Sequence, residues 1–286
     1  MSKGYLILAQ NTNDTDFLKL AYVNALTIKL TQTSVSSVSL VTDVVDAVPD
    51  HYREVFDNVI PIPWFDDALQ STWKIENRWK LYHVSPYDEM VILDSDMLFL
   101  TDVSHWWKYM STHDICITNK VCTYRNEIVT KDSYYRKAFI NNDLPNAYSA
   151  FAYFKKSENS RQFWSLVTDI VKNWEEYYSN FLTKTPVSYL SIDVAFALAI
   201  KILGIEDEVF SNFEYPTFVH MKSHIQGWRS LSDDWRNHVG AYFDSNGSLK
   251  IGNYQQTGVF HYTEKSLITD EVLYLYENLY KDRYNG

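Results

Sequence analysis

The chain has 286 residues, of which 46% are hydrophobic and 22% are charged, and its formal net charge is −10 at pH 7. That acidic balance argues against nucleic acid as a partner, because affinity for nucleic acid comes mostly from Lys and Arg side chains that neutralise phosphates. The sequence also contains no apolar stretch approaching the roughly 18 residues of a transmembrane helix, so no membrane span is expected.

The N-terminal segment and the cysteines indicate the compartment. The apolar run over 5–9 is too short for a signal peptide, and no cleavage site follows it. Cys116 and Cys122 are the only cysteines, which excludes a disulfide scaffold or a cysteine zinc site and favours a reducing, cytoplasmic environment. Most aromatic side chains are expected to fill the core, and exposed rings could stack on sugars or line an interface, including that of a homo-oligomer.

In the first 120 residues, short apolar strands alternate with helices. The spacing of apolar residues predicts strands over 5–9, 37–42, 59–62 and 114–119, and a further strand that begins near Met90 and carries Asp94 and Asp96 at its C-terminal end. It predicts helices over 17–30, 49–56, 75–83 and 102–110. Strands that alternate with helices of this length imply an α/β fold with parallel pairing and right-handed crossovers. In such sheets, ligands bind outside the carboxyl ends of the strands.

The rest of the chain is less regular. The segment 122–145 is polar and rich in Tyr, and it is either a surface loop or a flap that closes on a ligand. Helices are then predicted over 158–179, 189–203 and 269–280, and strands over 147–154, 217–221, 241–244, 249–252 and 259–262. We find no internal repeat and no long linker, so a single domain is expected.

Asp94 and Asp96 stand two residues apart inside an apolar run over 90–100. A buried strand does not tolerate an unpaired charge, so these side chains must lie where the strand reaches the surface at its C-terminal end. Alternate positions of an extended backbone point to the same side. Two carboxylates on one side suit Mg²⁺ or Mn²⁺, which completes its coordination with substrate phosphates. The alternative is an Asx-rich turn without a ligand.

The order of these features resembles the GT-A fold glycosyltransferases and is most similar to family 8, the glycogenin and bacterial lipopolysaccharide glycosyltransferase group. The resemblance is strongest over the first 110 residues and continues over most of the chain. It rests on Asn13-Asp14 with Phe17, Arg78-Trp79-Lys80-Leu81, Val91-Ile92-Leu93-Asp94-Ser95-Asp96-Met97-Leu98, Tyr148-Ser149-Ala150, Asp193, and Gly258-Val259-Phe260-His261-Tyr262 with Lys265.

The resemblance implies a Rossmann-like, mostly parallel mixed sheet flanked by helices, in a single GT-A domain over 1–286. Residues 1–120 would form the nucleotide-binding half, and residues 121–286 the acceptor-side half with a C-terminal extension. The implied reaction is metal-dependent transfer of a sugar from a nucleotide-sugar, by default a UDP-sugar, with retention of the anomeric configuration. The acceptor stays open between a glycan, a lipid, a protein and a nucleobase.

The same resemblance implies roles for individual residues. Asp94, Asp96 and His261 would bind Mn²⁺ or Mg²⁺ between the two donor phosphates. Lys265 would neutralise the departing diphosphate. Asp193 would orient the sugar or stabilise positive charge at its anomeric carbon. The remaining positions expected to contact the nucleotide or the donor sugar are Ala9, Asn11, Asn13, Arg78, Lys80 and Ser95.

The chain departs from the family pattern in places. Val194 stands where the family has Gln, and Tyr148 stands where it has Asn. Lys265 follows His261 by four positions without the family's Gly and Pro-Trp. These differences affect the expected identity of the donor more than the expected metal ligands. His220 also ends an apolar run close to a Lys, and it competes with His261 as the third metal ligand.

The same residues allow three other functions. A haloacid-dehalogenase phosphatase would use Asp94 as a nucleophile and needs a downstream acidic pair, for which Asp233-Asp234 is the only candidate. Three strand-helix units before Asp94 argue against it. A nucleotidyltransferase needs a Gly-rich basic loop after the first strand, and residues 10–16 lack one. A non-catalytic sugar-nucleotide-binding protein would keep the fold without turnover.

Overall fold

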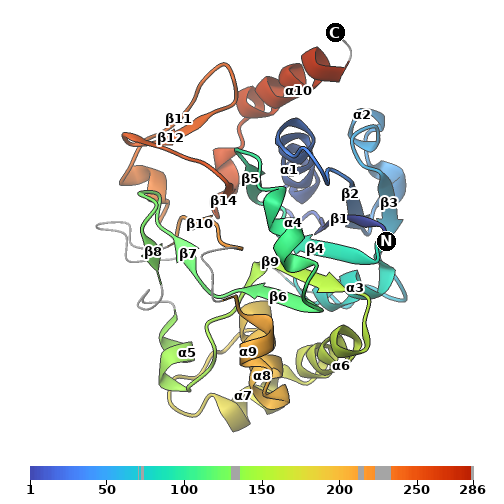
Figure 1. Ribbon diagram of the computed structural model, residues 1–286, viewed down its shortest axis with the longest axis vertical. Helices are drawn as coiled ribbons and strands as arrows, with labels where there is room; N and C mark the ends of the chain where they lie inside the picture. The colour runs from blue at the N-terminus through green and yellow to red at the C-terminus, as the bar shows by residue number, and fades with distance from the viewer. Residues whose placement is uncertain (70, 72–73, 130–135, 212–215, 223–232, 285–286) are drawn as a thin grey trace.

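A computed structural model describes residues 1–69, 71, 74–129, 136–211, 216–222 and 233–284 (Figure 1). Its main sheet has six strands in the order β3-β2-β1-β4-β9-β6. Strands β3, β2, β1 and β4 are parallel, and β9 is antiparallel to both β4 and β6. The mixed, mostly parallel sheet expected from the sequence is confirmed. The strands are β1 (Lys3–Leu8), β2 (Val38–Thr42), β3 (Asn58–Pro61), β4 (Glu89–Leu93), β6 (Ile115–Thr118) and β9 (Tyr148–Lys155).

Helices cover both faces of this sheet, because alternate side chains of its strands point to opposite faces. Tyr5 and Ile7 of β1 belong to the core beneath α1 (Phe17–Thr31), α4 (His105–Met110) and α10 (Asp270–Tyr284). Leu6 belongs to the core beneath α6 (Glu158–Lys172), α7 (Trp174–Phe181) and α8 (Ile192–Leu203). In Figure 1, α1 and α10 accordingly lie on one side of the sheet, and α6 and α8 lie on the other.

A second sheet has the order β5-β14-β10-β7-β8. Its strands are β5 (Met97–Phe99), β7 (Val121–Cys122), β8 (Ile128–Val129), β10 (Val219–His220) and β14 (Val259–His261). β14 is antiparallel to β5 and parallel to β10, so that His261 pairs with both Met97 and His220. The chain crosses from the main sheet to the second sheet between β4 and β5, which is where Asp94 and Asp96 stand.

The remaining elements are short. β11 (Ala241–Phe243), β12 (Leu249–Ile251) and β13 (Tyr254–Gln255) form an antiparallel sheet of their own. The short helices are η1 (Val45–Ala47), α2 (Asp50–Arg53), η2 (Arg78–Lys80), α3 (Leu81–Val84), α5 (Lys137–Asn141), α9 (Glu206–Val209), η4 (Trp235–Asn237) and η5 (Lys265–Leu267).

The helix expected over 49–56 is limited to α2, and two other predicted helices also differ from the observed ones. The helix expected over 158–179 is divided into α6 and α7 at Asn173, whose Nδ2 donates to the Asp169 carbonyl and carboxylate at 3.1 and 2.9 Å. Such a side chain competes with the helical backbone. The helix expected over 75–83 is limited to η2 and α3, because Asn77 just before them bonds outward to Gln10 and Asp66.

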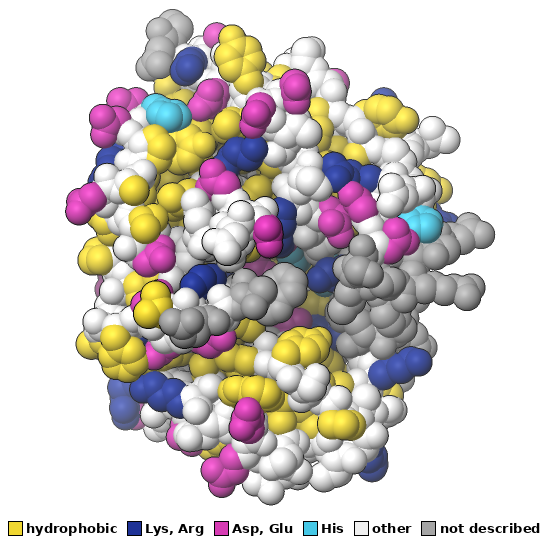
Figure 2. Space-filling model, turned by 180° about the vertical axis from the view of Figure 1, so that it is seen from behind, with side chains coloured by type: hydrophobic (Ala, Val, Ile, Leu, Met, Phe, Trp, Pro, Cys, Tyr) yellow, Lys and Arg dark blue, Asp and Glu magenta, His cyan; other side chains and the backbone are white. Residues whose placement is uncertain are grey.

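The segment 122–145, expected to be either a surface loop or a flap, is only partly described. Its described residues form β7, β8 and α5, and residues 130–135 lie outside the described part of the chain. Within the described ranges, none of the helices combines the length and the apolar character that crossing a bilayer requires. On the face drawn in Figure 2, acidic and basic described side chains are interspersed rather than gathered by sign.

The start of β4 is fixed by a buried carboxylate. Glu89 Oε2 accepts from Ser111 Oγ at 2.5 Å and from Tyr153 OH at 2.8 Å, and it lies 2.9 Å from Lys3 Nζ. Burial raises the pKa of Glu89, and the hydrogen bonds from Ser111, Lys3 and Tyr153 outweigh burial and hold that pKa below its usual value. The ionised carboxylate therefore stabilises the junction of β1, β4 and β9.

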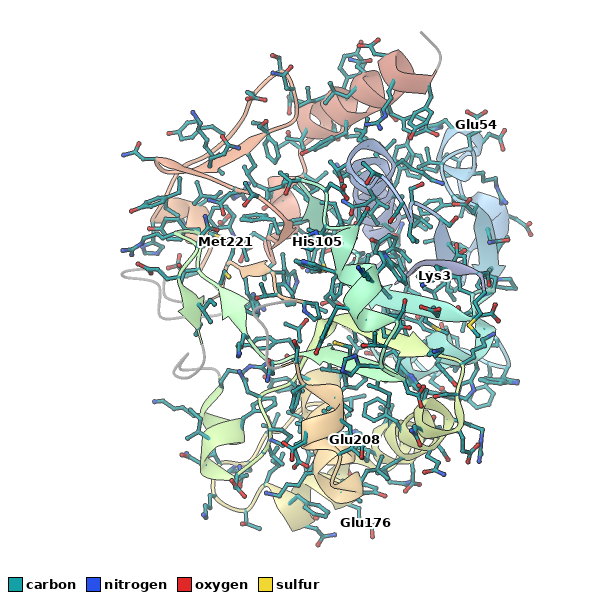
Figure 3. All side chains as sticks on the ribbon, viewed as in Figure 1. Lys3, Glu54, His105, Glu176, Glu208 and Met221 are labelled. Carbon is teal, nitrogen blue, oxygen red and sulfur yellow. The ribbon has the colours of Figure 1, made fainter. Side chains whose placement is uncertain are left out.

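We predict that Glu89→Gln lowers the free energy of unfolding by about 1.5–3 kcal/mol at pH 7, the range for hydrogen bonds to a charged group. The folded pKa is lower than the unfolded pKa of about 4.3, so this contribution is present above that pH and is lost as the pH falls through the folded pKa. Urea unfolding across this range should show the difference between parent and variant shrinking in acid. Glu54→Gln, at an exposed position on the periphery (Figure 3), is the control. A difference independent of pH would contradict the assignment.

Candidate active site

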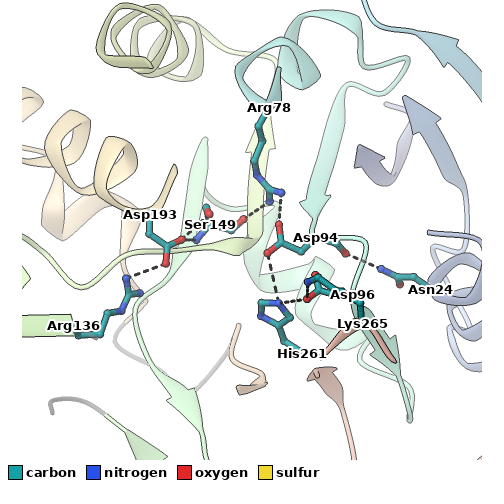
Figure 4. A network of polar contacts seen from close by, with 9 residues as sticks. All are labelled: Asn24, Arg78, Asp94, Asp96, Arg136, Ser149, Asp193, His261 and Lys265. Atoms are coloured by element: carbon teal, nitrogen blue, oxygen red, sulfur yellow. Dashed lines mark hydrogen bonds and ion pairs between the residues drawn. The ribbon is translucent and has the colours of Figure 1, made fainter. Parts of the chain in front are cut away.

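The turn between β4 and β5 carries two of the predicted metal ligands, and its backbone is held from two sides. The Asp94 amide donates to the Ala150 carbonyl of β9 at 3.0 Å, and Asn24 Nδ2 of α1 donates to the Asp94 carbonyl at 3.0 Å (Figure 4). Asn24 is fully buried and was not anticipated from the sequence. The sequence signal that could have identified Asn24 is its position, because it is a polar residue on the apolar face of α1.

The structure brings Asp94, Asp96 and His261 together, with one ligand atom from each lying within 4.8 Å of the others. His261 Nε2 lies 3.1 Å from Asp96 Oδ2 and 3.7 Å from Asp94 Oδ2. The topology explains this convergence, because β14 pairs with β5 directly after the acidic turn. Two carboxylate oxygens and an imidazole nitrogen are a donor set that suits Mn²⁺, so these residues fit the expected ion.

His220 occupies a different place from its competitor His261. The two rings are stacked with their centroids 4.9 Å apart, at an interplanar angle of 20°. His261 supplies the nitrogen that faces the carboxylates, whereas His220 lies behind its ring and is not part of the group of possible ligands. Burial, followed by the nearby positive charges, holds the pKa of His220 well below its usual value, so this imidazole is neutral.

Cationic side chains hold both carboxylates of the turn. Arg78 Nη1 pairs with Asp94 Oδ1, and Lys265 Nζ pairs with Asp96 Oδ2. Burial raises the pKa of Asp96, but the charges of Lys265 and His261 outweigh burial and keep this pKa well below its usual value. Asp96 is therefore ionised. The Lys265 side chain is 34% exposed, in contrast to 6% for Asp96, so the ammonium reaches the carboxylate from the open side.

Asp193 lies on the other side of β9 from the acidic turn. Its Oδ1 accepts from the amide and the hydroxyl of Ser149 at 2.8 and 2.7 Å, and its Oδ2 lies 3.0 Å from Arg136 Nη1. Arg78 Nη2 donates to the Ser149 carbonyl at 2.7 Å. A continuous polar network thus joins Asp94 to Asp193 (Figure 4). Arg136 was not anticipated, because no pattern marks it within the irregular segment 122–145.

The sequence matches no protein-family model and no curated protein. The solved structures to which the chain is similar include the following two. One is mouse xyloside xylosyltransferase 1 in its apo form, with 12% identity, a TM-score of 0.47, and coverage of 91% of this chain and 97% of that one. The other is the galactosyltransferase LgtC in complex with donor and acceptor sugar analogues, with 12% identity, a TM-score of 0.55, and coverage of 98% of this chain and 95% of that one. The chain has the GT-A glycosyltransferase fold.

Within this GT-A fold, the positions expected to bind the nucleotide follow β1, beside the acidic turn that follows β4. Ala9 is buried, and its amide donates to the Val41 carbonyl at 2.9 Å. Asn11 Oδ1 accepts from the Leu18 amide at 2.9 Å at the start of α1, and Asn13 is exposed. Ser95 is buried in the turn itself. Contacts of these residues with a nucleotide stay predictions.

Lys80 has a structural role in the GT-A fold of this chain. Its side chain is 1% exposed, and its Nζ bonds the Phe65 carbonyl and lies 3.1 Å from Asp67 Oδ2. The ammonium therefore anchors the segment 65–67, and its contact with a donor also stays a prediction. Asp233 and Asp234, the acidic pair that a phosphatase would need, are paired with His238 and Arg236 of their own segment.

Proposed function

We propose that the chain is a metal-dependent glycosyltransferase that transfers a sugar from a nucleotide-sugar, by default a UDP-sugar, with retention. The observation that carries the proposal is the convergence of Asp94, Asp96 and His261 at the carboxyl end of β4. The fold is that of LgtC, whose structure was solved with donor and acceptor sugar analogues. In the proposal, residues 1–120 bind the nucleotide, and residues 121–286 face the acceptor.

A Mn²⁺ or Mg²⁺ ion held by these three side chains would supply Lewis-acid stabilisation of the leaving diphosphate. The chain's own residues do the remaining work. Arg78 fixes the Asp94 carboxylate through their ion pair, and Asn24 fixes its backbone. Lys265 turns from Asp96 towards the diphosphate and neutralises charge that develops there. Asp193, held by Ser149, faces the sugar and stabilises positive charge at its anomeric carbon.

The proposal also covers the nucleotide pocket, the acceptor, the location and the oligomeric state. Ala9, Asn11, Asn13 and Ser95 would hold the uridine and ribose, and Lys80 would support this pocket through the segment that it anchors. The acceptor class stays open between a glycan, a lipid-linked sugar, a protein and a nucleobase. The cytoplasmic location rests on the two free cysteines. Association into a homo-oligomer rests only on the high aromatic content.

We predict that the parent protein hydrolyses at least one sugar-nucleotide in the presence of Mn²⁺, in a screen of UDP-sugars and GDP-mannose. Asp96→Asn should lower this rate at least about 100-fold, because the variant loses a charged ligand of the ion that stabilises the leaving group. Released nucleotide diphosphate is the readout. EDTA should abolish the parent activity, and added Mn²⁺ should restore it.

Asp143→Asn is the matched control, because Asp143 is an exposed carboxylate that also pairs with a lysine, Lys201. Equal rates for Asp96→Asn and the parent would mean that the site is wrongly assigned. Binding of UDP and Mn²⁺ without hydrolysis of any donor would indicate a non-catalytic protein. A phosphoryl group trapped on Asp94 would indicate a phosphatase instead.

We predict opposite effects of Lys265→Met on two affinities. Without nucleotide, the Lys265 ammonium competes with Mn²⁺ for Asp96, so its removal should raise Mn²⁺ affinity by up to about fivefold, the limit for a partly exposed pair. With Mn²⁺ present, UDP should bind roughly 10- to 100-fold more weakly, because the diphosphate loses a charge-assisted bond. Calorimetric titrations measure both, with the exposed Lys281→Met as control. Weakening of both affinities would contradict the exchange of Lys265 between Asp96 and the diphosphate.

A further inference from the structure

A column of stacked side chains connects Asp193 with the metal ligand His261. The guanidinium of Arg136, which pairs with Asp193, lies over the Tyr148 ring with its central carbon 3.7 Å from the centroid. The rings of Tyr148 and His220 form a T-shaped pair with centroids 5.7 Å apart and an interplanar angle of 80°, and the His220 ring stacks on the His261 ring with centroids 4.9 Å apart. The two polar ends of the site are therefore in contact through side chains as well as through the network around Ser149.

This column is buried throughout its length. Arg136, Tyr148, His220 and His261 are exposed by 3%, 2%, 6% and 9%, respectively. Close-packed interiors leave side chains little freedom, so a shift of one member displaces its neighbours. A buried guanidinium also carries a large desolvation penalty, and an apolar side chain of similar volume would fill the same space without it. An arginine at this position thus needs an explanation beyond packing.

The bonding of Arg136 uses what distinguishes a guanidinium from an ammonium. In its plane, Nη1 lies 3.0 Å from Asp193 Oδ2, and Nη2 donates to the Ala147 carbonyl at 2.7 Å. Its guanidinium also contacts the Tyr148 and Phe139 rings, with its central carbon 3.7 and 4.2 Å from their centroids. A rigid planar cation can bond in its plane and stack at the same time, whereas an ammonium cannot.

We propose that Arg136 is a positioning residue that fixes the Asp193 carboxylate relative to His261 through Tyr148 and His220. The inference rests on the proposed glycosyltransferase function, in which Asp193 faces the sugar and His261 holds the ion beside the diphosphate. Arg136 then sets where the carboxylate stands with respect to the bond that breaks. It touches neither the ion nor the reacting atoms.

The first test is Arg136→Lys, which keeps the positive charge and removes the planar guanidinium with its two Nη donors. We expect kcat for hydrolysis of the UDP-sugar that the parent cleaves fastest to fall about 10- to 100-fold, the range for residues that orient a ligand. The KM for that donor and the affinity for UDP should stay within about twofold, because residues 1–120, which bind the nucleotide in the proposed function, are unchanged. Arg161→Lys, at an exposed arginine paired with Glu158, is the matched control.

The second test separates positioning from general stability. In an Asp193→Asn background, Arg136→Lys should lower kcat by no more than about twofold, because residues that act as a unit are not additive. The proposal would be overturned if Arg136→Lys lowered kcat by the same factor in the Asp193→Asn background as in the parent, or if it left kcat unchanged in the parent. Thermal unfolding verifies that each variant is folded. If Arg136→Lys does not fold, Arg136→Gln replaces it, and the same changes in kcat decide the test.

The third test addresses the column itself. Tyr148→Leu removes the ring between Arg136 and His220 without changing a polar partner of either carboxylate, and it should lower Mn²⁺ affinity in the presence of UDP about 10-fold. Unchanged Mn²⁺ affinity would overturn the connection to His261. Failure of the proposed function has another signature, because the parent protein itself would then neither bind UDP with Mn²⁺ nor hydrolyse a donor.

Discussion

The carboxylates of Asp94 and Asp96 need positive charge nearby, because they stand where the chain leaves one buried sheet and enters another. Asp96 is the more constrained of the two, with only 6% of its side chain exposed. Removing a charge from water costs several kcal/mol unless a partner compensates. Arg78, Lys265 and His261 provide that compensation in the described structure. A divalent ion would place two positive charges beside the carboxylates in a smaller volume.

The topology of the second sheet makes this arrangement possible. Asp96 and His261 are far apart in the sequence, yet β14 pairs with β5 so that His261 stands opposite Met97. β10 then places His220 beside His261, and β9 places Ser149 between Arg78 and Asp193. The site is therefore rigid where strands meet, and its adjustable parts are the long side chains that reach it. Lys265 is the most exposed of these cations, which suits it to move between partners.

Local patterns made much of this architecture predictable. Short apolar runs located the strands of the main sheet, and the Asp-x-Asp pair inside an apolar run located the acidic turn. Other features depend on contacts between distant segments, which periodicity does not encode. Asn173 divides a helix through its own side chain, and Asn24 and Arg136 gain their roles only from neighbours that folding brings to them. Of the two candidate histidines, strand pairing distinguishes His261 from His220.

The central claim is that the side chains of Asp94, Asp96 and His261 hold a divalent ion beside a nucleotide diphosphate. The most direct measurement is an anomalous-difference map from crystals of the protein grown with Mn²⁺ and UDP. The account predicts one manganese peak in contact with all three side chains, with Lys265 turned from Asp96 to the diphosphate. A manganese peak elsewhere, or Lys265 still paired with Asp96 and no peak among the three side chains, would contradict it.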